Sequence, residues 1–314
     1  MNAPTRIAVT GAGGQVGYSL VFRIALGGIF GPEHPVALSL MERPDCLPIL
    51  RALEMELTDC SLPVLQDVRI SSDPYEAFRD ADWIILLGSR GWSSRSERRL
   101  ELLRESGPAF VEYGRAIQAE APGARVLVVA NPCNTNCLIA RSHAPSVLEP
   151  RWFAMNHLDR MRATALVATK AGVAPSEISR VIVWGNHSES VFVDFNNIHI
   201  QHKPAPEVIR DRAWVQDVFH PTVRRRTSEI LRLRGASPAA STAQAILTTI
   251  RSITCPTPHP HFFSASVISD GSYGVPRGLV FGFPLRTEDG QSWSIAQGLY
   301  HDDFAQEQIA ANVD

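Results

Sequence analysis

The sequence lacks the features that mark several large classes of protein. It has only five cysteines among 314 residues, an odd number without the spacing of a disulfide framework, which is typical of reduced thiols. No apolar run approaches the ~20 residues that a membrane-spanning helix needs. The 30 lysines and arginines balance 32 acidic residues without forming charged tracts, so we expect neither a nucleic-acid nor a membrane partner.

The residues that ligate metals are also sparse. Cys133 and Cys137 are spaced like one half of a metal site, but the sequence has no matching second pair. His259 and His261 flank a proline, which is typical of a loop. We therefore predict no metal site. The chain enters a strand pattern at residue 7, which leaves no room for a secretion signal, so we expect a cytoplasmic location.

The first half of the sequence contains alternating strand and helix patterns. With 45% hydrophobic and 20% charged residues, the chain is long enough for two packed domains. Near-continuous apolar runs separated by helical spacing predict parallel strands that are covered on both faces. The expected strands are residues 7–10, 36–41, 83–87 and 125–130, and the expected helices are residues 16–24 and 100–119, the latter interrupted near Gly107 and Pro108.

The pattern changes near residue 150. Further expected helices are residues 164–171, 211–233 and 239–250, and further expected strands are residues 181–184, 191–193, 198–200, 264–268 and 278–284, with 191–193 and 198–200 antiparallel around a turn at Asn196 and Asn197. We therefore predict an α/β fold. A Rossmann-type, doubly wound parallel sheet at residues 1–150 would bind a dinucleotide, and a mixed α+β substrate and catalytic domain would follow at residues 151–314.

A glycine-rich turn follows the first expected strand. Gly11, Gly14 and Gly17 are spaced by three residues, and Gln15 and Val16 lie between the last two. Glycines let the backbone approach a pyrophosphate, and the N–H groups that open the following helix attract its charge. We predict that these five residues bind a dinucleotide, although the same pattern also fits a tight turn that binds nothing.

Glu42 follows the second expected strand, at the place where an acidic residue accepts hydrogen bonds from the adenosine ribose. A carboxylate there repels the extra phosphate of NADP, so we predict NAD as the cofactor. Arg43 follows directly and can soften that preference, which leaves NADP possible.

The most informative residues in the chain are Asp159, Arg162 and His187. Asp159 and Arg162 are three residues apart and share a face of an expected helix, while His187 closes a buried-type strand. A carboxylate that orients an imidazole, beside a guanidinium that binds a carboxylate, is typical of a proton-transfer site with a substrate anchor. Each residue alone is more often a loop histidine or an intrahelical ion pair, so the interpretation depends on their joint occurrence with the glycine-rich turn.

At these residues the chain resembles the malate dehydrogenases of the lactate/malate dehydrogenase superfamily, in particular the cytosolic-type branch. The resemblance covers nearly the whole chain, and several separate motifs in the right order are more specific than any one of them. Its strongest stretches are residues 11–20, 53–60, 131–136, 181–188 and 267–276.

The resemblance implies roles for individual residues. His187 would take the hydroxyl proton of a 2-hydroxy acid as hydride leaves C2 for the nicotinamide, and Asp159 would fix the histidine tautomer. Arg162 would hold the C1 carboxylate in a two-pronged pair, and Asn131 would contact both substrate and cofactor. The family also implies a homodimer.

The loop after the strand at residues 83–87 departs from the family pattern. Family members carry one loop arginine that binds the distal carboxylate of the substrate and a later one that polarises the carbonyl when the loop closes. Arg99 is the preferred match for the later arginine and Arg98 the alternative, because the loop has one extra residue. Trp92, Ser93 or Ser94 stands where the first arginine is expected, and Arg90 and Arg95 are near enough to replace it.

This departure leaves the substrate open. A second carboxylate buried without a cation costs several kcal/mol, so oxaloacetate is a poor substrate unless Arg90 or Arg95 binds it. Trp92 could instead line a pocket for an apolar 2-oxo acid, or simply pack the closed loop. We predict an NAD-dependent malate dehydrogenase-like oxidoreductase. The alternatives are a specialised 2-oxo acid reductase that does not prefer oxaloacetate and a non-catalytic NAD-binding regulatory protein.

Overall fold

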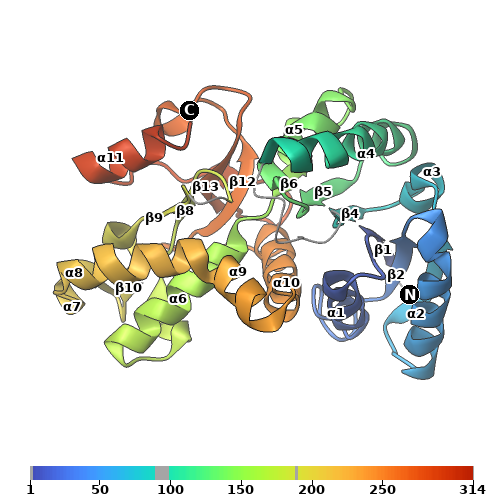
Figure 1. Cartoon of the computed structure of the whole chain (residues 1–314), viewed down its shortest axis with the longest axis horizontal. Coiled ribbons are helices and arrows are strands. Elements are labelled where there is room, and N and C mark those ends of the chain that lie inside the picture. Colours follow the sequence, from blue (N-terminus) through green and yellow to red (C-terminus); the bar gives the residue numbers. More distant parts are fainter. Residues whose placement is uncertain (1–2, 89–98, 188–189, 314) are drawn as a thin grey trace. The chain divides into compact units, whose positions relative to one another are not determined.

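The computed structural model describes residues 3–88, 99–187 and 190–313, with no side-chain description for residues 99–102. The chain folds into two compact units (Figure 1). The first comprises Met1–Ala154 with Pro238–Leu247, and the second comprises Met155–Ser237 with Thr248–Asp314. In the described part of the chain, the helices are all too short or too polar to cross a membrane.

The first unit is built on parallel strands in the order β6-β5-β4-β1-β2-β3. Strands β1 and β2 are in register from Thr5 opposite Val36 to Thr10 opposite Met41, so their carboxyl ends lie at the same edge. The strand order reverses between β1 and β4, which is the place where such sheets bind nucleotides. The strands are β1 (Thr5–Thr10), β2 (Val36–Met41), β3 (Leu65–Ser71), β4 (Trp83–Leu86), β5 (Arg125–Val128) and β6 (Trp152–Ala154).

Continuous apolar runs explain these strands, since β2 and β4 are buried along their whole length. The edge strand β3 is different, because its residues are half-exposed or exposed and polar residues interrupt it. The sequence pattern did not reveal it for that reason. The helices of this unit are α1 (Gln15–Ala25), α2 (Leu47–Asp59), α3 (Pro74–Phe78), α4 (Arg99–Glu120) and α5 (Cys133–Ser142).

Helix α4 runs without a break through Pro108, so the predicted interruption near Gly107 and Pro108 is wrong. Proline inside a helix removes one hydrogen bond. Packing outweighs that loss here, because Phe110 is buried and α4 lies so close to α5 that a Cβ on Gly114 would be 2.2 Å from the carbonyl oxygen of Ala140.

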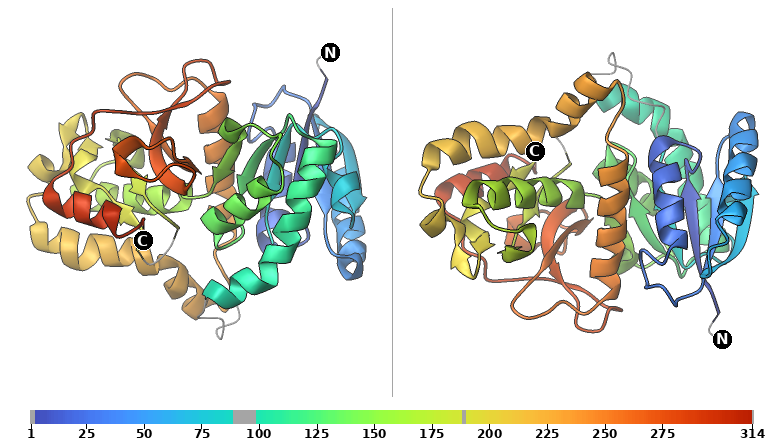
Figure 2. Two further views of the ribbon diagram at one scale, coloured as in Figure 1. Left: turned by 90° about the horizontal axis from the view of Figure 1, so that it is seen from above. Right: turned by 90° about the horizontal axis from the view of Figure 1, so that it is seen from below.

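The second unit combines helices with short antiparallel sheets, as Figure 2 shows from two sides. Strands β14, β13 and β12 pair antiparallel in that order, a three-stranded sheet has the order β11-β10-β7, and a two-stranded sheet pairs β8 with β9. The strands are β7 (Ile178–Ser179), β8 (Val183–Trp184), β9 (Phe192–Val193), β10 (His199–Ile200), β11 (Lys203–Pro204), β12 (Phe263–Ile268), β13 (Val280–Arg286) and β14 (Ser294–Ile295).

The pieces at residues 191–193 and 198–200 are strands, but they do not pair with each other as predicted. Strand β9 pairs with β8, whereas β10 pairs with β7 and β11. Between them Phe195–Asn197 forms a 3-10 turn, in which Asn197 Nδ2 donates to Asp194 Oδ2 at 2.7 Å and Phe195 is buried. This turn leads the chain away from β9, so the two strands join different sheets.

The predicted helix at residues 211–233 is divided. It consists of a single turn α8 (Arg212–Trp214), a π-helical turn (Val215–Phe219) and α9 (His220–Arg234). Pro221, which has no N–H to donate, lies in the first turn of α9. The other helices of this unit are α6 (His157–Ala171), α7 (Ala205–Val208), α10 (Ala240–Thr254), which continues from the first unit, and α11 (Asp303–Ala310).

Candidate active site

The glycine-rich turn between β1 and α1 is tightly packed against its own backbone. Gly11 has a φ of +62°, and a Cβ on Gly17 would lie 2.5 Å from the carbonyl oxygens of Gly11 and Ala12. Helix α1 begins at Gln15, where Gly14 provides no side-chain cap and the first turn has no acidic residue. The N–H groups at this helix start can therefore bind an anion such as a pyrophosphate.

Glu42 lies beside this turn. The parallel register of β1 and β2 brings the residue after Met41 to the same edge as Gly11, and the Glu42 Cγ is 3.6 Å from the position of a Cβ on Gly13. A half-buried carboxylate at this edge can accept hydrogen bonds from two ribose hydroxyls. The turn and Glu42 together thus fit the phosphate and ribose groups of a dinucleotide.

Asn131 follows β5 in the first unit. Its peptide bond to Pro132 is cis, and its side-chain oxygen Oδ1 is buried with no hydrogen-bond partner among the described residues. A buried amide oxygen without a partner costs free energy unless a bound group donates to it. The residue therefore suits a ligand contact, as the resemblance implies.

In the second unit one carboxylate contacts both a histidine and an arginine. Asp159 is 1% exposed, and its Oδ2 lies 2.5 Å from His187 Nδ1 while its Oδ1 lies 3.1 Å from Arg162 Nη1. An ionised carboxylate can only accept, so Nδ1 carries the proton of the neutral imidazole. Nε2, which has no hydrogen-bond partner among the described residues, can contact a ligand. The structure thus brings together the three residues that the sequence singled out.

The local fold explains this arrangement. Asp159 lies in the first turn of α6, where the helix dipole favours a negative charge, and its N–H donates to Asn156 O. Arg162, one turn later, follows on the same face of the helix. His187 comes after β8, beyond a bend at Gly185, whose φ is +84°.

Arg162 is largely buried, with 8% of its side chain exposed. Burial lowers its pKa, Asp159 raises it and the nearby charge of Arg226 lowers it further, but an arginine stays protonated at any ordinary pH. Its Nη2 donates to Thr227 Oγ1 on α9 at 2.7 Å. No sequence pattern predicted this contact, because nothing local relates α6 to α9.

The neighbouring pair His157 and Arg160 does not compete for the proton-transfer role. His157 is buried, and burial together with the charge of Arg160 lowers its pKa to about 3, so it stays neutral. The Nη1 of Arg160 lies 3.3 Å from His157 Nε2. The two side chains that flank Asp159 in the sequence are thus in contact with each other.

Trp92 and Arg95, together with Arg90 and Arg98, lie outside the described residues. Arg99 is the first residue of α4, and only its backbone is described.

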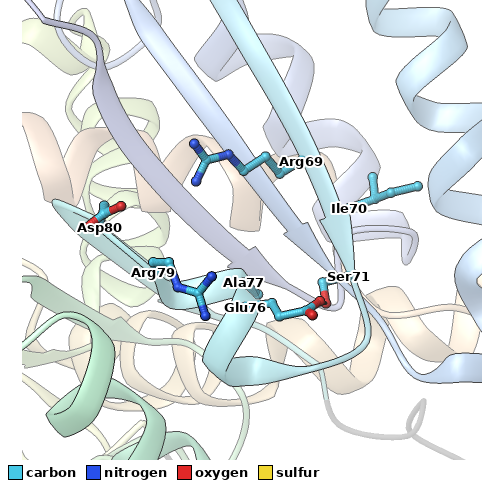
Figure 3. Close-up of a pocket in the computed structure, with 7 residues that line it drawn as sticks. All are labelled: Arg69, Ile70, Ser71, Glu76, Ala77, Arg79 and Asp80. Carbon is cyan, nitrogen blue, oxygen red and sulfur yellow. The ribbon is translucent and has the colours of Figure 1, made fainter.

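A surface pocket in the first unit is lined by residues other than the predicted ones, although its lining residue Ser71 accepts from Glu42 N at 3.2 Å (Figure 3). It has a volume of about 460 Å³, and its basic side chains are already paired, Arg69 with Asp67 and Arg79 with Glu120. We assign it no role in the chemistry. It is lined by Arg69, Ile70, Ser71, Glu76, Ala77, Arg79 and Asp80.

Two models of known protein families match this chain, one in each half. Residues 5–151 match the NAD-binding domain of lactate/malate dehydrogenases, and residues 156–314 match the alpha/beta C-terminal domain of the same family. A malate dehydrogenase of Protochlamydia amoebophila is 42% identical over 311 residues, which cover 98% of this chain and 94% of the relative.

Comparison with solved structures agrees with this family match. A malate dehydrogenase of Naegleria fowleri is 34% identical with a TM-score of 0.94, over 100% of this chain and 95% of the other. A lactate dehydrogenase of Trichomonas vaginalis, solved with NADH and oxamate, is 31% identical with a TM-score of 0.93, over 98% and 95%. The chain belongs to the lactate/malate dehydrogenase family, and it is an NAD-dependent oxidoreductase that interconverts a 2-hydroxy acid and its 2-oxo acid.

Proposed function

We propose that this enzyme reduces oxaloacetate to malate and that Asp159, Arg162 and His187 form its substrate site. The observation that carries the proposal is the single buried carboxylate of Asp159, which contacts both the imidazole and the guanidinium. Relatives that are 42% identical and carry the name malate dehydrogenase support the choice of substrate.

His187 acts as the general acid in this proposal. NADH, when bound, supplies the hydride that reaches C2 of the 2-oxo acid. His187, protonated on both nitrogens, donates the proton on Nε2 to the carbonyl oxygen, and it takes a proton back in the reverse reaction. Asp159 holds Nδ1 and stabilises the imidazolium electrostatically, without itself becoming protonated.

Arg162 anchors the substrate through its C1 carboxylate. Asp159 and Thr227 each accept one N–H of the guanidinium, which has five. Enough donors remain for a two-pronged pair with a carboxylate, and burial strengthens that pair. Arg99 would polarise the carbonyl of the bound 2-oxo acid.

The first unit contains the residues that we propose to bind the cofactor. We propose that Gly11, Gly14, Gln15, Val16 and Gly17 hold the pyrophosphate. Glu42 would bind the ribose and favour NAD over NADP, and Asn131 would contact both cofactor and substrate. In this proposal residues 1–150 form the dinucleotide-binding domain and residues 151–314 the substrate domain.

A specialised 2-oxo acid reductase is the second candidate. Its support is the loop sequence, where Trp92, Ser93 or Ser94 replaces the expected arginine and only Arg90 or Arg95 is near. A lactate dehydrogenase among the structural neighbours, 31% identical to this chain, also favours it. In this case Trp92 would line a pocket for an apolar side chain.

NADH oxidation at 340 nm with oxaloacetate, pyruvate, phenylpyruvate and a branched aliphatic 2-oxo acid separates the two candidates. Malate dehydrogenase activity requires that kcat/KM for oxaloacetate exceeds the others by tenfold or more, about 1.4 kcal/mol of discrimination. A preference for a monocarboxylic acid would instead establish the second candidate. Repetition with NADPH tests the choice of cofactor.

We also propose that the enzyme works as a cytoplasmic homodimer, as its resemblance to cytosolic-type malate dehydrogenases implies. Light scattering coupled to size-exclusion chromatography tests the dimer, since a monomer at micromolar concentration would contradict it.

A further inference from the structure

One buried amide outside the reacting groups contacts both sides of the segment that carries His187. Asn312 follows helix α11 and is 5% exposed. Its Nδ2 donates to Ser190 O at 2.8 Å, and its Oδ1 accepts from Ser190 Oγ at 2.9 Å. These two bonds hold Ser190, three residues beyond His187.

The same amide also packs against the bend at Gly185, two residues before His187. A Cβ on Gly185 would lie 2.5 Å from both Cγ and Oδ1 of Asn312, and Gly185 has a φ of +84°. The Asn312 side chain thus packs directly against the Gly185 backbone. Gly185 is held from its other side by Gly282, whose N–H donates to Gly185 O at 3.0 Å. Gly185 and Ser190, on either side of His187, are therefore each held by Asn312.

The Asn312 amide makes all its hydrogen bonds in a single orientation. Its second N–H donates to Gln308 O at 2.8 Å, so both donors and the acceptor are used. Arg224 of α9 completes the network: its Nε donates to Val191 O at 2.9 Å and its Nη2 donates to Gln308 Oε1 at 2.9 Å. Arg224 thus connects helix α9 to the backbone of Val191 and to Gln308 of helix α11.

Helix α9 also links this network to the substrate anchor. Arg224 and Thr227 are three residues apart and lie on one face of α9. Arg224 holds the segment after His187, while Thr227 accepts from Arg162. The positions of the imidazole and of the guanidinium therefore depend on the same helix.

We propose that Asn312 is a positioning residue for His187. It acts through Gly185 and Ser190 to hold the imidazole at the 2.5 Å contact with Asp159, and it touches no reacting group. The inference rests on the proposed role of His187. A loosened segment would leave substrate binding at Arg162 intact but would misplace the proton donor, so kcat falls while KM stays constant.

The test compares Asn312→Ala and Asn312→Asp with Gln306→Ala. Gln306 lies on helix α11, which Asn312 follows; it is exposed and its side chain donates to His301 O, which makes it the matched control. We expect both Asn312 variants to lose about tenfold to a hundredfold in kcat, with KM within twofold and the Kd for NADH unchanged. Aspartate keeps the size and the acceptor but lacks both donors, so its loss shows that the hydrogen bonds matter.

A pH profile distinguishes positioning from a merely structural role. The imidazole of His187 contacts Asp159, which also contacts the charged guanidinium of Arg162. If Asn312→Ala weakens the contact between His187 and Asp159, we expect the pH profile of kcat/KM for 2-oxo acid reduction to change. A variant with a lowered melting temperature but wild-type kcat and wild-type pH profile would overturn the proposal.

Two further variants keep the result interpretable. If Asn312→Ala does not fold, Ser190→Ala removes only the hydroxyl donor, and we expect about a threefold loss in kcat; an unchanged kcat would again overturn the proposal. His187→Asn is measured in parallel. If His187→Asn retains turnover, the proposed role of His187 fails; if it abolishes turnover while the Asn312 variants stay active, the positioning role alone fails.

Discussion

At the scale of single residues, the site depends on one buried carboxylate with two partners. Asp159 and Arg162 could be paired from the sequence because a spacing of three residues places side chains on one face of a helix. The contact between Asp159 and His187 could only be suspected, since they are 28 residues apart. Thr227 and Asn312 escaped notice, because a threonine or an asparagine in a polar stretch carries no signal of its own.

Thr227→Val tests the hydrogen bond that orients the anchor. Valine has the same shape as threonine but cannot accept from Arg162 Nη2, which lies 2.7 Å from the hydroxyl. A bond to a charged group is worth ~1.5–3 kcal/mol, so we expect KM for the 2-oxo acid to rise about tenfold, with a smaller change in kcat. Steady-state kinetics measures both.

The control for this variant is Thr164→Val on α6, whose hydroxyl donates to Arg160 O and not to the anchor. An equal rise in KM for both variants, or no rise for Thr227→Val, would contradict a role of Thr227 in substrate binding.

Glu42→Ala tests the choice of cofactor. Removal of the carboxylate beside the glycine-rich turn takes away both a ribose acceptor and the repulsion of a 2′-phosphate. We expect the ratio of kcat/KM for NADH to that for NADPH to fall about tenfold or more, or ~1.4 kcal/mol. Kinetics with both cofactors measures the ratio; an unchanged ratio would show that Glu42 does not bind the ribose.

At the scale of secondary-structure elements, buried strands were easier to predict than exposed or short ones. The apolar runs at β1, β2, β4 and β5 predicted strands close to their observed bounds. The edge strand β3 could not be predicted, because half-exposed positions alternate too weakly to stand out. The pairing of β9 with β8 was missed since two-residue strands carry no register information.

Helix α4 offers a test at this scale. Pro108 is exposed in a continuous helix, where it costs up to ~3 kcal/mol relative to alanine. Pro108→Ala should therefore raise the free energy of unfolding by about 1–3 kcal/mol, measured by urea denaturation. Ala109→Gly, at the next and also exposed position, should lower it by ~1 kcal/mol. A loss of stability in Pro108→Ala would mean that the proline ring makes contacts the helix needs.

At the scale of the whole molecule, buried histidines make stability depend on pH. Burial and the charge of Arg160 lower the pKa of His157 to about 3, and burial and the charge of Arg224 lower that of His220 to about 4. In an unfolded chain a histidine titrates near ~6.5. Below that pH the unfolded chain takes up protons that the folded chain does not, so acid favours unfolding.

We expect the urea midpoint to fall between pH 7 and pH 5, with each buried histidine contributing up to about 1.4 kcal/mol per pH unit. His220→Phe should flatten this dependence and keep the ring stacking on Phe192. His202→Gln, at an exposed position, should leave the dependence unchanged. A wild-type slope in His220→Phe would show that His220 is not held neutral in the folded protein.

Apolar periodicity, glycine spacing and helical faces are local properties of a chain, and they were enough to predict the class of the first unit, the glycine-rich turn and the residues that we propose for proton transfer. The contacts of Thr227 with Arg162 and of Asn312 with Ser190, 122 residues earlier, could be found only in the folded chain. Such contacts arise from the packing of helices α6, α9 and α11, whose free energy depends on distant surfaces that meet only in the folded protein.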